Sequence, residues 1–245
     1  MRAQAALVTV LLGALLAACS PGGAEQFTPS PTPTPTPTAA PSVDVTDPAV
    51  VRSTGLVVTS GAVSLSVVGA DVAATGQDDG SVRVSAPGGD ALVAAPVGMV
   101  LAVLTDGSAV VRDAAGTFVA GLTTEPWGAR LSPVGPEVAR LTVDATGPAT
   151  VWLAATAVQS AVWGEAEGGT SLAVTPSAWS RAGSLAAQEG LWAQLVAQAP
   201  DADTPGMRAQ LECHELGAPD KATWNLEPWR PEVGVLEMIS ERCNP

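Results

Sequence analysis

Short runs in which apolar and polar residues alternate fill the chain from residue 49 to residue 158, with Gly and Asp between them. Alternation with a period of two is typical of half-buried strands, and the intervening residues suit tight turns. Expected strands lie at residues 55–59, 62–68, 81–85, 99–104, 109–112 and 139–143, with Trp152 and Val158 in a last strand. Expected hairpin turns lie at residues 78–80, 88–89, 106–107 and 115–116. This spacing, with almost no helical periodicity, predicts an antiparallel β-sandwich or meander over residues 49–158.

The pattern changes at residue 159, where a smaller α+β module is expected to begin and to continue to residue 245. Its first element is a hairpin at residues 161–165 and 170–174, followed by a turn that carries Trp179. A helix is expected at residues 186–199 and a second helix at residues 231–242, with residues 211–213 extended. The expected apolar faces of the two helices are Trp192, Leu195, Val196 and Ala199, and Val235, Leu236, Ile239 and Cys243. The fold class is therefore mainly β with a smaller α+β C-terminal module.

The first eighteen residues have the organisation of a signal peptide. Arg2 provides a positive start, and residues 5–16 are almost entirely apolar. This apolar core is too short for a bilayer span, which needs about 20 residues. The segment ends in Leu-Ala-Ala-Cys19, which resembles the lipobox of bacterial lipoproteins. In that family the cysteine thiol receives diacylglycerol and becomes the first residue after cleavage, so a lipid is expected on Cys19. A plain secretory signal with an incidental cysteine is the alternative.

Residues 19–48 form a tether rich in Pro and Thr. Every second residue between Thr28 and Thr38 is proline, which lacks an N–H and fixes φ, so neither helix nor sheet is expected there. A polyproline II segment rises about 3.1 Å per residue, so roughly thirty residues reach on the order of 90 Å. An O-glycosylated stalk and an unmodified spacer are both compatible with this composition.

The chain is strongly acidic, with 24 Asp and Glu residues against 11 Lys and Arg residues and a net charge of −13. Such a charge repels nucleic acid and anionic lipid head groups, and nucleic acid is therefore not an expected partner. No segment after the signal peptide offers eighteen consecutive apolar residues. The expected attachment to the membrane is therefore through the N-terminal lipid.

The three cysteines of the chain divide into one lipid site and one pair. With Cys19 taken by lipid, Cys213 and Cys243 remain to form a structural disulfide in an oxidising compartment. A bridge that closes about thirty residues stabilises by about 3 to 4 kcal/mol in the loop-entropy model. Free thiols for redox work are the alternative, but the close Cys-x-x-Cys spacing is absent from the sequence. The expected bridge staples a helix at Cys243 to an extended segment at Cys213.

The C-terminal stretch has a long and compositionally unusual pattern. It comprises Cys213-His214, the run Lys221-Ala-Thr-Trp-Asn-Leu-Glu-Pro-Trp-Arg-Pro231, and the terminal Cys243-Asn-Pro245. This pattern resembles a domain of unknown function in secreted proteins and lipoproteins of high-GC Gram-positive bacteria, over about residues 160–245. Pro126-Trp127 also resembles modules that precede that domain. The resemblance implies an exported location and no activity, so it supplies no catalytic residue.

His214 and Lys221, each the single residue of its type, are weak candidates for catalysis. A general base needs a nucleophile within hydrogen-bond reach, and neither Gly-x-Ser-x-Gly nor Ser-x-x-Lys is present. A structural histidine beside the disulfide is the favoured interpretation of His214. A desolvated lysine can serve as a base, but an ion pair with a carboxylate such as Glu227 is the simpler expectation. Zinc, calcium, phosphate and dinucleotide motifs are absent from the sequence, so no metal and no cofactor is expected.

Residues 224–231 are the candidate binding surface. The binding candidates in this segment are Trp224, Asn225, Glu227, Trp229 and Arg230. Clusters of aromatic residues and Arg form interface hot spots, and indole faces also stack on sugar rings. An internal clasp is the favoured alternative, with both tryptophans in the core and Arg230 capping carbonyl groups.

These features favour a non-enzymatic lipoprotein on the outer face of the plasma membrane, which binds a protein or glycan partner or is otherwise associated with the cell envelope. A hydrolase or toxin-like effector that uses His214 is the second hypothesis. A purely structural surface protein is the third.

Overall fold

The computed structural model describes residues 44–144 and 147–245. Within these residues the chain is mainly antiparallel β-sheet with a few helices and a C-terminal disulfide, so the expected fold class is confirmed. The signal peptide at residues 1–18, the lipid site at Cys19 and nearly all of the tether at residues 19–48 lie outside the described residues. The domain boundary expected at residue 158 stays a prediction. No helix in the described ranges has both the length and the apolar character needed to cross a bilayer.

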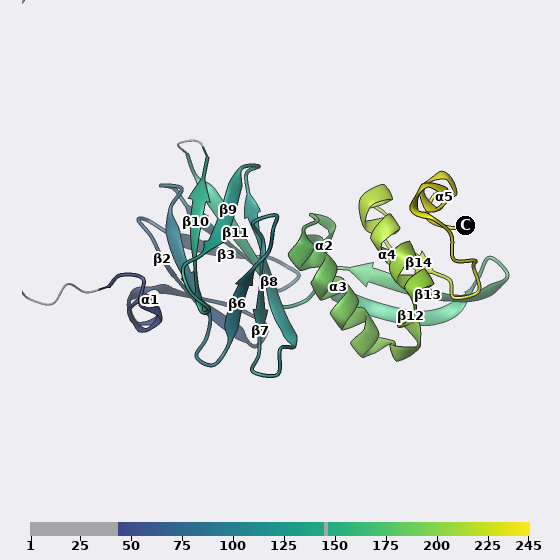
Figure 1. Ribbon diagram of the computed structural model, residues 1–245, viewed down its shortest axis with the longest axis horizontal. Coiled ribbons are helices and arrows are strands. Elements are labelled where there is room, and N and C mark those ends of the chain that lie inside the picture. The colour runs from purple at the N-terminus through teal and green to yellow at the C-terminus, as the bar shows by residue number, and fades with distance from the viewer. Residues whose placement is uncertain (1–43, 145–146) are drawn as a thin grey trace, which may run out of the picture. The chain divides into compact units, whose positions relative to one another are not determined.

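Two antiparallel sheets form the N-terminal part of the fold (Figure 1). The first has the strand order β1-β2-β5-β10-β9, and the second has the order β3-β4-β11-β8-β7-β6. The first sheet comprises β1 (Leu56–Ser60), β2 (Val63–Val68), β5 (Ala91–Ala94), β10 (Val138–Val143) and β9 (Ala129–Pro133). The second comprises β3 (Ala73–Gly76), β4 (Val82–Ala86), β11 (Ala149–Ala154), β8 (Phe118–Glu125), β7 (Ala109–Arg112) and β6 (Val100–Val103).

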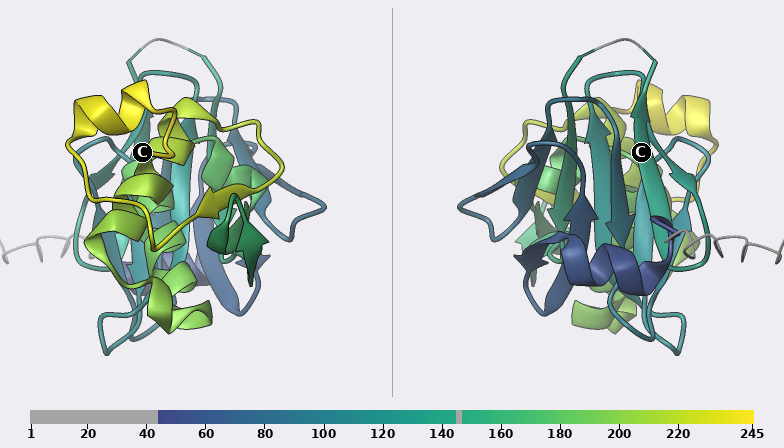
Figure 2. Two further views of the ribbon diagram at one scale, coloured as in Figure 1. Left: turned by 90° about the vertical axis from the view of Figure 1, so that its right-hand side faces the viewer. Right: turned by 90° about the vertical axis from the view of Figure 1, so that its left-hand side faces the viewer.

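The inner faces of these two sheets share one hydrophobic core, which defines a sandwich. It includes Val67, Val93 and Leu141 from the first sheet and Val84, Leu122 and Val151 from the second. The helix α1 (Pro48–Thr54) lies on the outer face of the first sheet (Figure 2), where Val51 packs with Leu92. Because β5 is buried on both faces, all four of its residues are apolar and do not alternate with polar ones.

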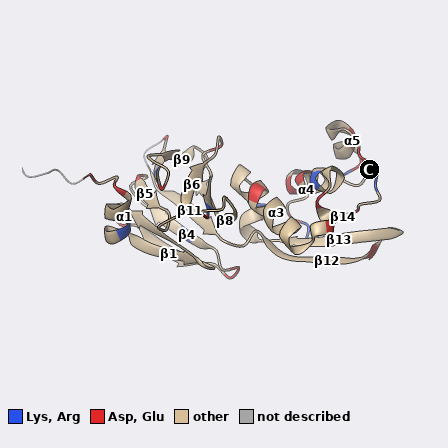
Figure 3. Ribbon diagram, turned by 60° about the horizontal axis from the view of Figure 1, so that its bottom comes forward, with Lys and Arg blue, Asp and Glu red and all other residues tan. Residues whose placement is uncertain are grey.

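The third sheet has the order β12-β13-β14 and belongs to the C-terminal module. Its strands are β12 (Val158–Ala166), β13 (Gly169–Pro176) and β14 (Trp224–Leu226). The other elements of the module are α2 (Ala178–Arg181), α3 (Leu185–Gln198), the 3₁₀ turn η1 (Pro200–Ala202), α4 (Pro205–Gly217) and α5 (Val235–Ser240). Acidic residues mark α3, α4 and the far end of the β12–β13 hairpin (Figure 3). The side chains of the sheet and helices bury Leu172, Trp224 and Leu226 completely.

Helix α3 packs directly on the outer face of the second sheet. Phe118 and Trp152 of that sheet share a buried cluster with Leu191 of α3. A Cβ atom at Gly190 would lie 2.6 Å from Cζ of Phe118, so a glycine is required for this close approach.

Polar side chains hold α3 at two places along its length. At its start, Oδ2 of Asp106 accepts a hydrogen bond from the Leu185 N–H at 2.8 Å, and Oγ of Ser108 accepts one from the Ala186 N–H at 3.1 Å. Farther along, Gln194 accepts from the N–H groups of Ala157 and Val158 at 2.8 and 3.1 Å. Its Nε2 donates to the Ala155 carbonyl at 2.7 Å. Gln194 therefore satisfies the backbone that connects β11 to β12.

The strong alternation in the sequence correctly predicted six strands, which are β1, β2, β4, β6, β7 and β10. The hairpin of β12 and β13 and the helix α3 were also predicted correctly. The single strand expected to hold both Trp152 and Val158 is wrong, because Trp152 lies in β11 and Val158 begins β12. The residues around Trp179 form the short helix α2 instead of a turn. The elements α1, β3, β5, β8, β9, η1, α4 and β14 were not predicted.

The expectations for residues 205–243 need correction. Residues 211–213 are not extended, because they belong to α4. The helix expected at residues 231–242 is limited to α5, and Val235, Leu236 and Ile239 are exposed while Met238 is buried. The disulfide between Cys213 and Cys243, with Cα atoms 5.5 Å apart, is confirmed. It joins α4 to the turn after α5, and not a helix to a sheet.

Candidate functional site

Helix α4 directs polar side chains toward the strand β14. Thr204 caps its start, where Oγ1 accepts a hydrogen bond from the Met207 N–H at 3.2 Å. Gln210 and His214 are each 1% exposed and lie four residues apart, so they share one helix face with Met207 and Leu211. Two polar residues interrupt the apolar face of this helix, which is why the sequence pattern did not indicate it.

Gln210 and His214 bind the backbone of the candidate segment at alternate residues. Nε2 of Gln210 donates to the Glu227 carbonyl at 3.0 Å, and the Glu227 N–H donates to Oε1 of Gln210 at 2.8 Å. Nε2 of His214 lies 3.0 Å from the Asn225 carbonyl, and a carbonyl accepts, so this nitrogen carries a proton. The two side chains of α4 thus satisfy backbone groups of residues 225 and 227.

The environment of His214 favours the neutral imidazole. Burial lowers the pKa of His214, the hydrogen bond to the Asn225 carbonyl raises it, and the charge of Lys221 lowers it again. Within the described residues Nδ1 has no hydrogen-bond partner. The ring is 1% exposed, so a substrate could reach Nδ1 only if the packing opened. The structural role expected for His214 stays a prediction.

Arg230 binds four groups from separate parts of the module. Its guanidinium donates to the carboxylates of Glu227 and Glu167 and to the carbonyls of Asn244 and Pro245, the last two at 3.1 and 3.0 Å. The side chains of Arg230 and Glu227 are 11% and 1% exposed, so this ion pair is largely shielded from water. Arg230 therefore connects the hairpin end, the candidate segment and the C-terminal residues, as the clasp hypothesis expected.

The two tryptophans of the segment differ in exposure. Trp224 is fully buried and its Nε1 donates to the Ala218 carbonyl at 2.9 Å. Trp229 is 47% exposed, so the expectation that both indoles lie in the core is wrong for it. The Trp229 ring lies against Gly169 and has the Arg230 guanidinium carbon 4.6 Å from its centroid. Asn225 is half-buried, and its backbone carbonyl is held by His214.

Lys221 does not pair with Glu227, contrary to expectation. Glu227 pairs instead with Arg230. Lys221 is exposed, and its backbone carbonyl accepts a hydrogen bond from Arg181 of α2. Arg181 also binds the carbonyls of Pro219 and Ala222, at 2.6 and 2.8 Å. These contacts hold the 219–222 loop in place and leave the Lys221 amine solvated.

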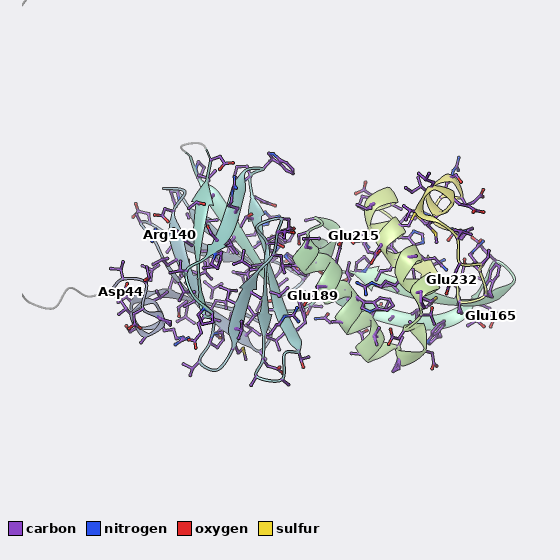
Figure 4. The ribbon with its side chains drawn as sticks, viewed as in Figure 1. Asp44, Arg140, Glu165, Glu189, Glu215 and Glu232 are labelled. Atoms are coloured by element: carbon purple, nitrogen blue, oxygen red, sulfur yellow. A yellow bond between two sulfur atoms is a disulfide. The ribbon has the colours of Figure 1, made fainter. Side chains whose placement is uncertain are left out.

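Glu215 is a buried carboxyl group that the sequence did not single out. It extends from α4 toward α3 (Figure 4) and is 7% exposed. Burial raises the pKa of Glu215 to about 7, a hydrogen bond from Gln188 lowers it, and the neighbouring charge of Glu212 raises it. In residues 44–144 and 147–245, no three His, Cys, Asp or Glu side chains lie close enough to hold a metal ion.

Comparison with known proteins concerns the C-terminal module. Residues 158–245 match a family described as "Protein of unknown function (DUF2599)". The resemblance of this stretch to a domain of unknown function is therefore confirmed.

Over 83 residues the chain is 48% identical to an uncharacterized protein of Mycobacterium tuberculosis (strain ATCC 25618 / H37Rv), which covers 31% of this chain and 56% of that protein. An uncharacterized protein of Mycobacterium leprae (strain TN) is 40% identical over 65 residues, which cover 25% of this chain and 53% of that protein. The chain spans about half the length of these curated relatives. No solved structure matches the chain.

Proposed function

We propose that this chain is an exported lipoprotein, anchored on the outer face of a membrane through Cys19, with a folded part that is a non-enzymatic binding or envelope-associated module. The burial of His214 is the observation that most supports a non-enzymatic module. The single histidine is 1% exposed and its Nε2 donates to a backbone carbonyl. A general base must reach the proton that it removes, and this ring is held in the interior instead.

The ion pair of Glu227 and Arg230 further supports a module without catalysis. Arg230 uses its donors on Glu227, Glu167 and two backbone carbonyls, so few remain for a substrate. Because these contacts are internal, the segment 224–231 acts mainly as a clasp, and Trp229 is its exposed part.

The start of the folded part supports the tether. Oδ1 of Asp47 accepts a hydrogen bond from the Ala49 N–H at 2.7 Å and caps α1, which begins at Pro48. Arg52 then fixes α1 to the sandwich through the Ala95 carbonyl at 2.9 Å and through Glu137. The sandwich thus holds the helix that follows the proposed tether.

Metabolic labelling tests the anchor. Wild-type chain and Cys19→Ser are expressed in a mycobacterial host with an alkyne fatty acid, and membranes are separated from the medium. We expect label and membrane retention for the wild type, and neither for Cys19→Ser. Equal labelling of both proteins would contradict the anchor.

Turnover assays test the non-enzymatic part. Peptidoglycan, lipid esters and peptides are incubated with the purified full chain and with His214→Ala. We expect no turnover by either protein. Hydrolysis by the wild type that His214→Ala abolishes would contradict the proposal and favour the effector hypothesis.

A further inference from the structure

A cleft of about 780 Å³ opens at one end of the sandwich, where the chain passes from β8 in the second sheet to β9 in the first. Its walls come from the β6–β7 turn, the β8–β9 loop and the α2–α3 connection at residues 182–184. Three segments distant in the sequence therefore meet at this cleft, away from the candidate segment 224–231.

Trp127 is the most exposed large apolar side chain that borders the cleft. Its exposed fraction is 103%, so the indole makes no packing contact that the fold requires. It follows Pro126, whose peptide bond with Glu125 is cis, and precedes Gly128, whose φ is +93°. An indole face left in water gains free energy when a flat apolar surface covers it.

Polar groups beside Trp127 retain capacity for further hydrogen bonds. Nη2 of Arg130 donates to both carboxylate oxygens of Asp144, at 2.7 and 2.6 Å. The two side chains are 54% and 66% exposed, and both bonds use one nitrogen, which leaves the other guanidinium donors for a ligand.

Thr123 gives the cleft wall a second polar feature. It is 6% exposed and lines the cleft, and among the described residues its Oγ1 has no hydrogen-bond partner. A buried hydroxyl without a partner is costly, so a movement of the cleft wall that brings Oγ1 to a ligand hydroxyl would be favoured. Asp106, by contrast, already accepts from Ser108 and Leu185 and belongs to the framework of the cleft.

We infer that this cleft binds a neutral sugar unit of a glycan. A sugar ring has an apolar C–H face that stacks on an indole and a rim of hydroxyl groups that both donate and accept hydrogen bonds. The indole of Trp127 suits stacking on the apolar face, and Arg130, Asp144 and Thr123 suit hydrogen bonds with the hydroxyl groups. Asp106 and Asp144 outnumber Arg130, which disfavours an acidic sugar. The inference rests on the proposed binding function and names its ligand class.

The choice against a lipid surface follows from the neighbours of Trp127. Glu125 and Asp144 near the loop pair with Arg83 and Arg130, so these arginines offer anionic head groups no excess positive charge. Insertion of the indole would also bring Arg130 and Asp144 toward the hydrocarbon boundary. A bound sugar leaves Arg130 and Asp144 with hydrogen-bond partners, because its hydroxyl groups replace water at these side chains.

Isothermal titration with defined sugars tests the inference. The full chain with Cys19→Ser, which carries no lipid, is titrated with neutral pentasaccharides built from glucose, mannose, galactose, arabinose or N-acetylglucosamine. Each sugar is raised to about 10 mM, so that even millimolar affinity is detected. We expect at least one sugar to bind saturably, and Trp127→Ala to weaken it at least about tenfold. Trp127→Phe is expected to keep most of the affinity, and Arg130→Gln to weaken it about as much as Trp127→Ala.

Trp163→Ala is the matched control, because it removes an indole of β12 that is 36% exposed and lies outside the cleft. Its sugar affinity should equal that of the parent chain. Absence of binding to every sugar would overturn the inference, as would equal affinities of the parent and Trp127→Ala. Trp127-dependent binding to phosphatidylcholine vesicles without sugar binding would also overturn it and assign the indole to lipid. Cleavage of a bound pentasaccharide would instead overturn the non-enzymatic part of the proposed function and leave the sugar site intact.

Discussion

The indole of Trp179 packs against the backbone of Gly121, so closely that a Cβ atom at residue 121 would lie 2.3 Å from Cη2 of the ring. Trp179 is fully buried and belongs to the C-terminal module, whereas Gly121 lies in β8 of the sandwich. Together with the contact of Phe118 and Gly190, this pair makes one interlocked surface between β8 and the helices α2 and α3.

Gly121→Ala is expected to destabilise the fold by about 1 to 3 kcal/mol, because the added methyl group must displace a buried indole or the strand itself. Gly76→Ala is the matched control, since Gly76 also lies in a strand and a Cβ there would meet no atom within 4 Å. Urea unfolding of the two variants measures the difference. A loss of stability that is equal in both variants would contradict the close-approach explanation.

Loss of the disulfide is expected to lower the free energy of unfolding by about 2 to 4 kcal/mol, since the bridge restricts the unfolded chain. The paired substitution Cys213→Ser and Cys243→Ser removes it without leaving a free thiol at either position. Urea unfolding with and without reductant provides the measurement: reductant should destabilise the wild type and leave the double variant unchanged. If reductant destabilised both proteins equally, its effect would not come from the bridge between Cys213 and Cys243.

Arg230→Met is expected to cost about 3 to 5 kcal/mol, because it leaves the carboxylate of Glu227 buried and unpaired. Adding Glu227→Gln should restore a large part of this loss, which a double-mutant cycle measures. Arg140→Met is the control, since its ion pair with Asp90 at 3.1 Å is exposed and should contribute at most about 1 kcal/mol. Similar losses for Arg230→Met and Arg140→Met would refute the clasp.

Protonation of His214 is expected to destabilise the protein in acid. Burial lowers the pKa of His214 in the folded state, while the unfolded chain keeps an ordinary value of about 6.5. The unfolded state therefore binds more protons as the pH falls through about 6.5, and stability falls with it. His214→Gln should remove this dependence on the acid side, which urea unfolding at several pH values measures. An unchanged acid slope in the variant would contradict the assignment.

Glu215 is expected to destabilise the protein at high pH, whereas His214 destabilises it at low pH. Its folded-state pKa is raised to about 7 from an ordinary 4.5. The folded state thus holds the proton more tightly, so its contribution to stability is complete below about 4.5 and disappears as the pH rises through about 7. Glu215→Gln should exceed the wild type in stability at about pH 8, by on the order of 1 to 3 kcal/mol. Glu232→Gln, at an exposed carboxylate (Figure 4), is the control and should leave the stability at about pH 8 close to that of the wild type.

Local patterns predicted the elements that have one buried and one exposed face, or that end at a clear turn. The strands β2 and β10 alternate because only one face meets the core, and the turns before β4 and β7 contain Gly80 and Gly107, both with positive φ. The strand β5 was missed because both of its faces are buried, so it shows no alternation. Helix α4 was misread because Gln210 and His214 occupy its buried face, where their partners come from residues 225 and 227.

In the candidate site, too, the sequence predicted some features and only the fold decided others. The pairing of Cys213 with Cys243 could be predicted, since cysteine counting needs no geometry once one residue is assigned elsewhere. The partner of Glu227 could not, because Lys221 and Arg230 are both near it in sequence and only the fold brings Arg230 to it. The cleft at Trp127 could not be predicted either, because its walls come from three segments that sequence proximity does not connect.

The sequence by itself determined the class of the fold, the disulfide and the expectation of an anchor at Cys19, because these depend on residue type and short-range spacing. Tertiary structure alone decided which polar groups are used internally and which remain available. His214 and Arg230 became structural because β14 and the C-terminal residues pack over them. Trp127 remained exposed because no element covers its loop within the described residues. Burial depends on every segment that packs nearby, and a local pattern contains no information about those neighbours.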